Sequence, residues 1–188
     1  MDRGLKVSVC VCFGFGFGFG FGFGFGFGFG SRARMNIEYL TWCADQAMEK
    51  YQIDMLSVIG TIRQYVDDNI ESFSSLKPPN GILLIIEEMG KVAGMGALRI
   101  LRDTVGEVKR MYIRPQFRGR GYGKQMVKRL LDEGRRLGCS SFLLDSAQFM
   151  PAAQHIYRSA GFKERGPYPE SEPPEIMRPY MVFMEKKE

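Results

Sequence analysis

A chain of 188 residues has room for one compact domain, and its formal charge of +5 at pH 7 is too small to indicate a nucleic-acid-binding protein. Residues 1–34 hold four basic side chains against Asp2, a net +3 that leaves +2 for the rest. One histidine and four scattered cysteines, Cys10, Cys12, Cys43 and Cys139, predict neither a metal site nor a disulfide framework. A reducing, cytoplasmic compartment is therefore expected, with no nucleic-acid or membrane partner.

Residues 13–30 are nine uninterrupted Phe-Gly pairs. Glycine at every second position makes a poor membrane helix and weakens the apolar core that a signal peptide needs. A perfect dipeptide repeat is typical of an expanded short nucleotide repeat, or of translation upstream of the true start. We therefore predict that residues 1–34 are a low-complexity leader, disordered or not native, and that residues 35–188 form a single domain. We also hypothesise that Met35 is the initiator.

Beyond the leader, the hydrophobic period predicts helices first and strands afterwards. Asn36 is the candidate cap of the first helix, and the turn cluster at 77–81 ends the second. Gly94 and Gly96 inside a strand indicate a bulge or close packing against a helix or ligand. In chain order we predict helices at 36–51 and 57–73, strands at 82–87, 91–101 and 105–113, a helix at 122–137, a strand at 142–145, a helix at 151–160, and strands at 162–164 and 180–185.

The turn between the third strand and the third helix is rich in glycine and arginine. Gly119, Gly121 and Gly123 alternate there with Arg118, Arg120 and Tyr122. Glycines let backbone amides approach a phosphate, and a helix N-terminus adds partial positive charge. Residues 118–138 hold seven Arg and Lys residues against two acids, which favours one anionic ligand over a long polyanion. The alternative is a tight turn with a solvated basic face.

This turn resembles the acetyl-CoA-binding signature Q/R-x-x-G-x-G/A of the GCN5-related N-acetyltransferase (GNAT) family, which Arg118, Gly121 and Gly123 meet. It lacks the GK[ST] end of a Walker loop and the glycine spacing of a dinucleotide fingerprint. The resemblance runs from about Gly81 to the C-terminus, and more loosely back to Met35. It implies an α/β (mixed α+β) acyl-CoA N-acyltransferase fold, with a central, mostly antiparallel sheet that is splayed at the cofactor site and flanked by helices. The family's first strand is supplied by residues 6–12 across the repeat, or is missing.

The resemblance implies a transferase that moves an acetyl group from acetyl-CoA to a primary amine by direct transfer in a ternary complex. Its implied partners are acetyl-CoA and a small-molecule, peptide N-terminal or lysine amine, and it also allows a homodimer. By the same resemblance, the main chain of Met111, Tyr112 and Ile113 pairs with the pantetheine arm. The pyrophosphate is then held by the amides of Arg118, Gly119, Arg120, Gly121, Tyr122, Gly123 and Lys124.

Tyr157, in the motif Y-x-x-x-G-F, occupies the position of the family's general acid. Its phenol is protonated at neutral pH and can donate to a leaving thiolate, and the alternative is a packing tyrosine. By the same resemblance Glu107 is the candidate base, with an ordinary exposed or ion-paired strand carboxylate as the alternative. Glu87 and Glu88 are weaker candidates for the base.

The remaining polar residues give less direct signals. His155 lies on a different helix face from Tyr157 and is expected at the surface or in packing. Asp145 orients the amine or caps a turn. Glu170, Glu172 and Glu175 form either an acidic mouth for a cationic amine or a solvated loop. Two other functions stay open: a non-catalytic acyl-CoA-binding domain of this fold, and a Phe-Gly-mediated interaction protein.

Overall fold

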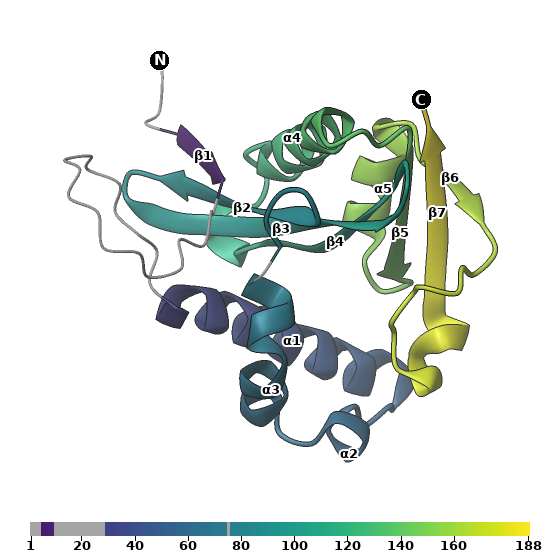
Figure 1. The fold of residues 1–188 in the computed structure, drawn as a ribbon. Helices are drawn as coiled ribbons and strands as arrows, with labels where there is room; N and C mark the ends of the chain where they lie inside the picture. The colour runs from purple at the N-terminus through teal and green to yellow at the C-terminus, as the bar shows by residue number, and fades with distance from the viewer. Residues whose placement is uncertain (1–4, 10–28, 75) are drawn as a thin grey trace.

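A seven-stranded sheet with the strand order β1-β2-β3-β4-β5-β7-β6 forms the centre of the molecule (Figure 1). The computed structural model describes residues 5–9, 29–74 and 76–188. The strands are β1 (Leu5–Val9), β2 (Gly81–Glu88), β3 (Lys91–Arg102), β4 (Val105–Ile113), β5 (Ser141–Ala147), β6 (Lys163–Arg165) and β7 (Met181–Lys187). The helices are α1 (Phe29–Tyr51), α2 (Leu56–Ile59), α3 (Ile62–Ser74), α4 (Tyr122–Arg136) and α5 (Pro151–Ser159), with short 3-10 turns at Pro115–Phe117 and Glu175–Tyr180.

Neighbouring strands run antiparallel except β4 and β5, which are parallel. These two strands pair only where residues 105–107 meet residues 141–143, so their later residues diverge. The predicted fold, a mostly antiparallel sheet that splays between two strands, is therefore confirmed.

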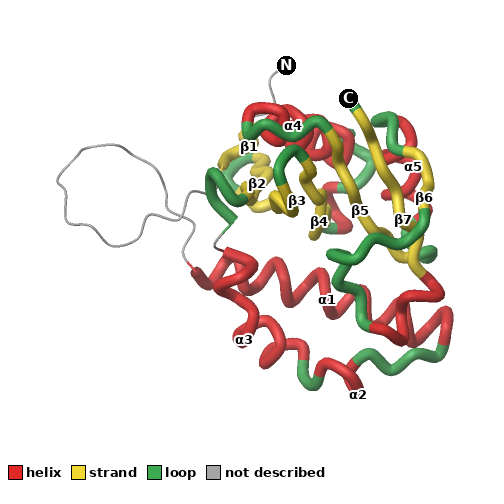
Figure 2. Tube along the Cα trace, turned by 45° about the vertical axis from the view of Figure 1, so that its right-hand side comes forward, coloured by secondary structure: helices red, strands yellow, loops and turns green. Residues whose placement is uncertain are grey.

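Helices cover both faces of the sheet, α4 and α5 on one side and α1 with α3 on the other (Figures 1 and 2). This explains why residues 82–86 of β2 are buried without alternation. Gly96 lets α4 approach closely, because a Cβ there would lie 2.8 Å from Cγ of Met126. On the opposite face, Met35 of α1 packs against β2, β3 and β4 through Ile85, Met95 and Tyr112.

The N-terminal helices differ from the prediction in two ways. The first begins at Phe29 instead of residue 36, so Asn36 is not its cap; its side chain is 3% exposed and accepts a hydrogen bond from Arg110. The single helix predicted at 57–73 is divided into α2 and α3 around Gly60, whose φ of 72° interrupts helical geometry. In the described part of the chain, no helix has the length and apolar character needed to cross a membrane.

The family's first strand is present as β1, which pairs with β2 from Leu5↔Glu88 to Val9↔Leu84. Of the two alternatives that the sequence leaves open, the first is therefore correct. Cys10, Cys12 and most of the Phe-Gly repeat lie outside the described residues. The domain boundary expected at residue 35 falls inside α1, and the non-native origin of the leader stays a prediction.

Candidate functional site

The glycine turn between β4 and α4 exposes a row of backbone amides. Gly119 and Gly121 have φ values of 75° and 81°, a left-handed conformation that favours glycine, and a Cβ at either would meet no atom within 4 Å. Within the described part of the chain, none of the amides from Gly119 to Lys124 donates a hydrogen bond. These donors and the N-terminus of α4 face open space, an arrangement suited to a phosphate group.

The basic side chains near these amides differ in what they contact. The Arg118 guanidinium lies over the ring of Trp42, 5.3 Å from its centroid, and its Nε donates to the Ile113 carbonyl. Lys124 is exposed beside it. The Arg120 side chain instead forms an ion pair of 2.6 Å with Glu88, so only its amide remains for an anion at the turn.

A cavity of about 600 Å³ opens at this turn and extends along the end of β4 to α5. Of the ten residues predicted to bind the cofactor, all except Arg120 line it. Its remaining walls come from α1, the turn after β4, and the start of α5: Trp42, Phe117, Phe149, Met150, Pro151, Ala152, Ala153 and Ile156.

The main chain of β4 changes course where it borders this cavity. Met95 pairs with Tyr112 but Ala97 pairs with Lys109, so β4 holds one extra residue in a bulge. Arg110, with φ of 55°, lies in this bulge. Beyond Glu107, β4 has no pairing to β5, which leaves one edge of the strand available to an extended ligand.

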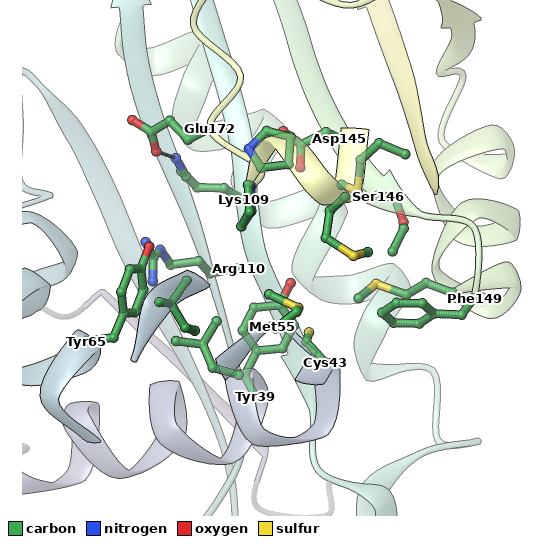
Figure 3. A pocket seen from close by; sticks show the side chains of 18 residues that line it. Tyr39, Cys43, Met55, Tyr65, Lys109, Arg110, Asp145, Ser146, Phe149 and Glu172 are labelled. Carbon is green, nitrogen blue, oxygen red and sulfur yellow. Dashed lines mark hydrogen bonds and ion pairs between the residues drawn. The ribbon is translucent and has the colours of Figure 1, made fainter. Parts of the chain in front are cut away.

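A second cavity of about 180 Å³ lies beside the first, and Phe149 and Met150 line both (Figure 3). It is bordered by α1, the α2–α3 region, β4, β5 and the loop before β7. Its polar residues are Tyr39, Tyr65, Lys109, Arg110, Asp145, Ser146 and Glu172. The two cavities are therefore neighbours along β4, one at residues 109–110 and the other at residues 111–113.

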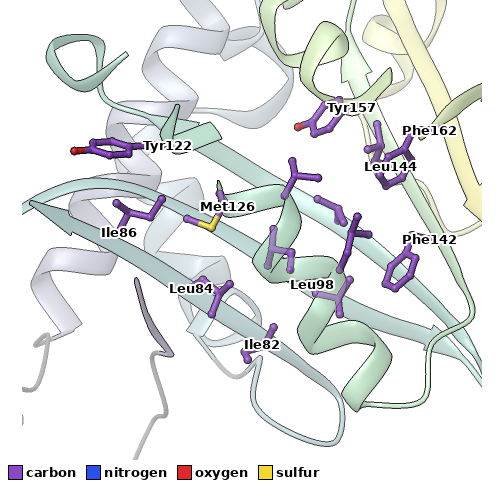
Figure 4. Close-up of a cluster of buried hydrophobic side chains, with 14 of the residues drawn as sticks. Ile82, Leu84, Ile86, Leu98, Tyr122, Met126, Phe142, Leu144, Tyr157 and Phe162 are labelled. Carbon is purple, nitrogen blue, oxygen red and sulfur yellow. The ribbon is translucent and has the colours of Figure 1, made fainter. Parts of the chain in front are cut away.

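Tyr157 of α5 is 6% exposed, and its ring packs against that of Phe162 with the ring centroids 6.0 Å apart (Figure 4). Burial raises the pKa of Tyr157 above its ordinary value, and the negative charge of Asp145 adds to this rise. The pKa of Tyr39 is also raised, by burial first, and by the charges of Cys43, Tyr157 and Asp145 in turn. Tyr157 therefore lies within electrostatic range of two residues of the second cavity, and its phenol stays protonated.

Glu107 is 1% exposed, and both of its carboxylate oxygens have partners. Oε2 lies 2.8 Å from Arg99 and 3.1 Å from Lys109, while Oε1 accepts a hydrogen bond of 2.8 Å from the Tyr168 hydroxyl. These contacts fit the alternative that Glu107 is an ion-paired strand carboxylate. Catalysis by Glu107 stays a prediction.

The other acidic candidates are also engaged. Glu172 pairs with Arg99 and, at 2.6 Å, with Lys109, while Glu170 pairs with Arg102. Glu175 pairs with Arg178 at 3.1 Å. All three glutamates of the predicted acidic mouth are therefore paired with basic residues, Glu170 and Glu172 with those of β3 and β4. Glu88 is held by Arg120, and Glu87 lies on β2 opposite Lys6 of β1.

Asp145 lies within β5 instead of at its end, so it does not cap a turn. Its Oδ2 accepts a hydrogen bond of 2.6 Å from Ser171, and burial raises its pKa. His155 is exposed on α5. Across the described residues, no group of three or more His, Cys, Asp or Glu side chains could hold a metal ion.

Sequence reasoning missed Trp42, Tyr39 and Arg110 as site residues. Both aromatic residues lie on α1, where Tyr39 packs against Tyr112 and Trp42 against Phe149. The position of the Arg110 side chain depends on the β4 bulge, and a strict alternation of side chains along a strand does not predict a bulge. The signal that could have identified Arg110 from the sequence is a basic side chain among the apolar residues of a strand.

Comparison with known proteins gives a consistent assignment. Residues 39–162 match the model of the acetyltransferase (GNAT) family. The chain is 33% identical over 131 residues to an IAA acetyltransferase of Azospirillum brasilense, which covers 68% of this chain and 82% of that relative.

Solved structures share the fold at lower identity. An acetyltransferase from Streptococcus agalactiae is similar with a TM-score of 0.67 and 18% identity, over 98% of this chain and 99% of that one. A Salmonella typhimurium protein assigned as an acetyltransferase, solved with its cofactor acetyl-CoA, is similar with a TM-score of 0.58 and 16% identity, over 98% and 94% of the two chains.

Proposed function

Because the chain belongs to the GNAT acetyltransferase family, we propose that it is an N-acetyltransferase that moves an acetyl group from acetyl-CoA to a primary amine, by direct transfer in a ternary complex. The observation that supports this most is that two neighbouring cavities share Phe149 and Met150 as lining residues, and that the larger one is bordered by the amide-rich turn. Two ligands could lie there end to end, as direct transfer requires.

The larger cavity fits the coenzyme. Unpaired amides from Gly119 to Lys124, with Arg118 and Lys124 beside them, suit the pyrophosphate. The free edge of β4 at Met111 to Ile113 suits the amides of the pantetheine arm. The coenzyme supplies an activated acetyl group as a thioester.

In the proposed reaction the amine nitrogen forms a bond to the acetyl carbon, and the bond from that carbon to sulfur breaks. The ammonium must lose a proton before attack, and the departing thiolate must gain one. Tyr157 is the proposed donor to the thiolate, because its buried phenol is protonated and the charge of Asp145, which lines the second cavity, reaches it. Its side chain lines neither cavity itself, whereas its neighbour Ile156 lines the larger one. Glu107 stays the predicted base, although removing a proton directly requires it to release one of its present partners.

Calorimetric titration with acetyl-CoA, followed by a thiol-release assay over a panel of amines, tests this function. Binding with amine-dependent thiol release is the expected result. Binding without release for any amine would favour the non-catalytic acyl-CoA-binding alternative. Failure to bind acetyl-CoA would refute the proposal, and loss of an interaction on deleting residues 13–30 would favour the Phe-Gly alternative. A cytoplasmic location, a homodimer, and the lack of nucleic-acid and membrane partners stay predictions.

A further inference from the structure

Two carboxylates among the described residues line the second cavity, and they differ in what they contact. One is Asp145 of β5 and the other is Glu172 of the loop before β7. Glu172 pairs with Lys109 at 2.6 Å and also with Arg99. Asp145 has no ion pair within the described part of the chain. It is therefore the carboxylate of this cavity that a cationic ligand can approach.

One hydrogen bond holds the Asp145 side chain. The Ser171 hydroxyl donates to its Oδ2 at 2.6 Å, and Oδ1 accepts no hydrogen bond from any described residue. Figure 3 shows Asp145 and Tyr39 on opposite sides of the cavity. The groups that an ammonium presents are hydrogen-bond donors only, so it needs an acceptor such as this carboxylate oxygen.

Glu107, the base expected from the sequence, has a different environment. It lines neither cavity, and its two oxygens already contact Arg99, Lys109 and the Tyr168 hydroxyl. Asp145 lines the acceptor side of the site, and burial raises the pKa of its carboxyl. A carboxylate with a raised pKa accepts a proton more readily, which suits a general base.

From this arrangement we propose that Asp145 is the catalytic base: its Oδ1 binds the ammonium of the acceptor and takes one proton from it before the attack on the thioester. Ser171 is a positioning residue, because its hydroxyl fixes the other carboxylate oxygen. This proposal rests on the proposed function, since it assigns one step of that same reaction. It gives to Asp145 the step for which the sequence favours Glu107.

The protons balance over one turnover. The ammonium gives one proton to Asp145, and the neutral nitrogen then attacks the acetyl carbon. The nitrogen–carbon bond forms, the carbon–sulfur bond breaks with its electron pair on sulfur, and the thiolate takes the proton of the Tyr157 phenol. The nitrogen loses a second proton, which restores the phenol, and Asp145 releases its proton to solvent.

The two proton transfers are coupled through charge. Burial is the main cause of the raised pKa of Tyr157, and the carboxylate charge of Asp145 adds to the rise. Once Asp145 has taken up a proton, this charge is gone and the pKa of Tyr157 falls. The first transfer therefore makes the phenol a stronger acid before the thiolate leaves.

Titratable groups surround Asp145 on every neighbouring element. Burial raises the pKa of the Tyr39, Tyr157 and Tyr168 phenols, and it raises that of the Cys43 thiol to about 12, so these four groups are neutral at neutral pH. The charged neighbours come from β4 and the loop before β7: Glu107, Lys109, Arg110 and Glu172. The fall of the rate at low pH should therefore follow the titration of Asp145.

Asp145→Asn removes the base and keeps the shape of the side chain. The probe is the fastest acceptor among 3-methylbutylamine, Nα-acetyl-L-lysine and a tripeptide with a free N-terminus, assayed by thiol release from about pH 5 to about pH 9. For wild-type protein, kcat/KM should rise to a level plateau. In the variant it should be at least about a hundredfold lower at neutral pH and rise about tenfold per pH unit, because only amine that is already neutral reacts. A lower rate with the wild-type profile would overturn the proposal.

Ser171→Ala tests the positioning role, and it also tests the proposal if Asp145→Asn does not fold. The hydrogen bond from Ser171 lowers the pKa of Asp145, against the larger effect of burial. Its loss should therefore shift the acid limb of kcat/KM to higher pH and leave the acetyl-CoA affinity, measured by calorimetry, unchanged. An unshifted acid limb would show that Asp145 is not the group that titrates.

Asp132→Asn is the matched control, because Asp132 lies on α4, lines neither cavity and pairs with Arg135 at 2.7 Å. It should keep the wild-type rate and pH profile. A rate that rises tenfold per pH unit in Glu107→Gln but not in Asp145→Asn would return the base role to Glu107 and leave the proposed function intact. Binding of acetyl-CoA without thiol release for any amine would refute the proposed function itself.

Discussion

Trp42 of α1 and Arg118 of the glycine turn lie in cation–π contact, with the guanidinium carbon 5.3 Å from the ring centroid. Trp42 is the only tryptophan of the chain and lines the larger cavity. Acetyl-CoA should therefore change the intrinsic tryptophan fluorescence in a saturable titration. Arg118→Gln should weaken binding about tenfold or more, as for the loss of a charged hydrogen bond of about 1.5–3 kcal/mol. Calorimetric binding without a fluorescence change would place the coenzyme elsewhere.

Gly121→Glu should abolish acetyl-CoA binding, because the new side chain would occupy the anion site and repel the pyrophosphate. Gly138 provides a matched control: its φ is 90°, a Cβ there meets nothing within 4 Å, and it follows the opposite end of α4. Both substitutions should cost about 1–2 kcal/mol of backbone strain. Gly138→Glu should nevertheless bind normally by calorimetry. Equal loss of binding in both variants would show that strain alone, and not the anion site, is responsible.

Tyr157→Phe should lower kcat by about a hundredfold or more and leave the acetyl-CoA affinity nearly unchanged, as expected for loss of a general acid. Tyr180→Phe is the control, since Tyr180 stacks on Tyr51 with ring centroids 4.3 Å apart and lines neither cavity. It should change stability by less than about 1 kcal/mol and keep kcat within a few-fold. Normal turnover in Tyr157→Phe would reduce Tyr157 to a packing residue.

Glu107→Gln tests whether Glu107 acts as the catalytic base or only as a buried, ion-paired carboxylate. The substitution breaks buried ion pairs to Arg99 and Lys109, so we expect a loss of about 3–5 kcal/mol in unfolding free energy, measured with denaturant. Glu164→Gln, which breaks an exposed pair with Arg158, should change stability by less than about 1 kcal/mol. If Glu107 is the base, the kcat of the variant should also fall sharply when it is measured under conditions in which the variant is folded. Retained turnover would exclude that role.

Asp145→Asn should stabilise the fold. Burial raises the pKa of Asp145, so the folded state holds this proton more tightly than the unfolded chain, and wild-type stability falls as pH rises between the two pKa values. At neutral pH the variant should therefore have a higher melting temperature than the wild type. The difference should vanish below pH about 3.9, the ordinary carboxyl pKa. A lower melting temperature at neutral pH would contradict this account.

The order of elements and the glycine turn could be predicted because both depend on local sequence. Hydrophobic period gives β2 to β7 nearly their observed bounds, and the alternation of glycine with arginine marks the anion site. The second cavity depends on contacts between distant residues. Arg110 meets Asn36 across 74 positions, and Lys109 meets Glu172 across 63, so no local pattern indicates that the acidic loop is neutralised.

The pairing of β1 with β2 has a consequence for any shortened form of the protein. Five residues of β2 make ladder contacts with β1, and residues 84–86 among them are buried and apolar. A chain that begins at Met35 would expose that edge, and open apolar edges recruit strands from other molecules. If Met35 is the initiator, we predict that two copies pair through the exposed edge of β2. For biochemical work, excising the Phe-Gly repeat while retaining residues 1–9 should give a better-behaved, less aggregation-prone preparation than cutting at Met35.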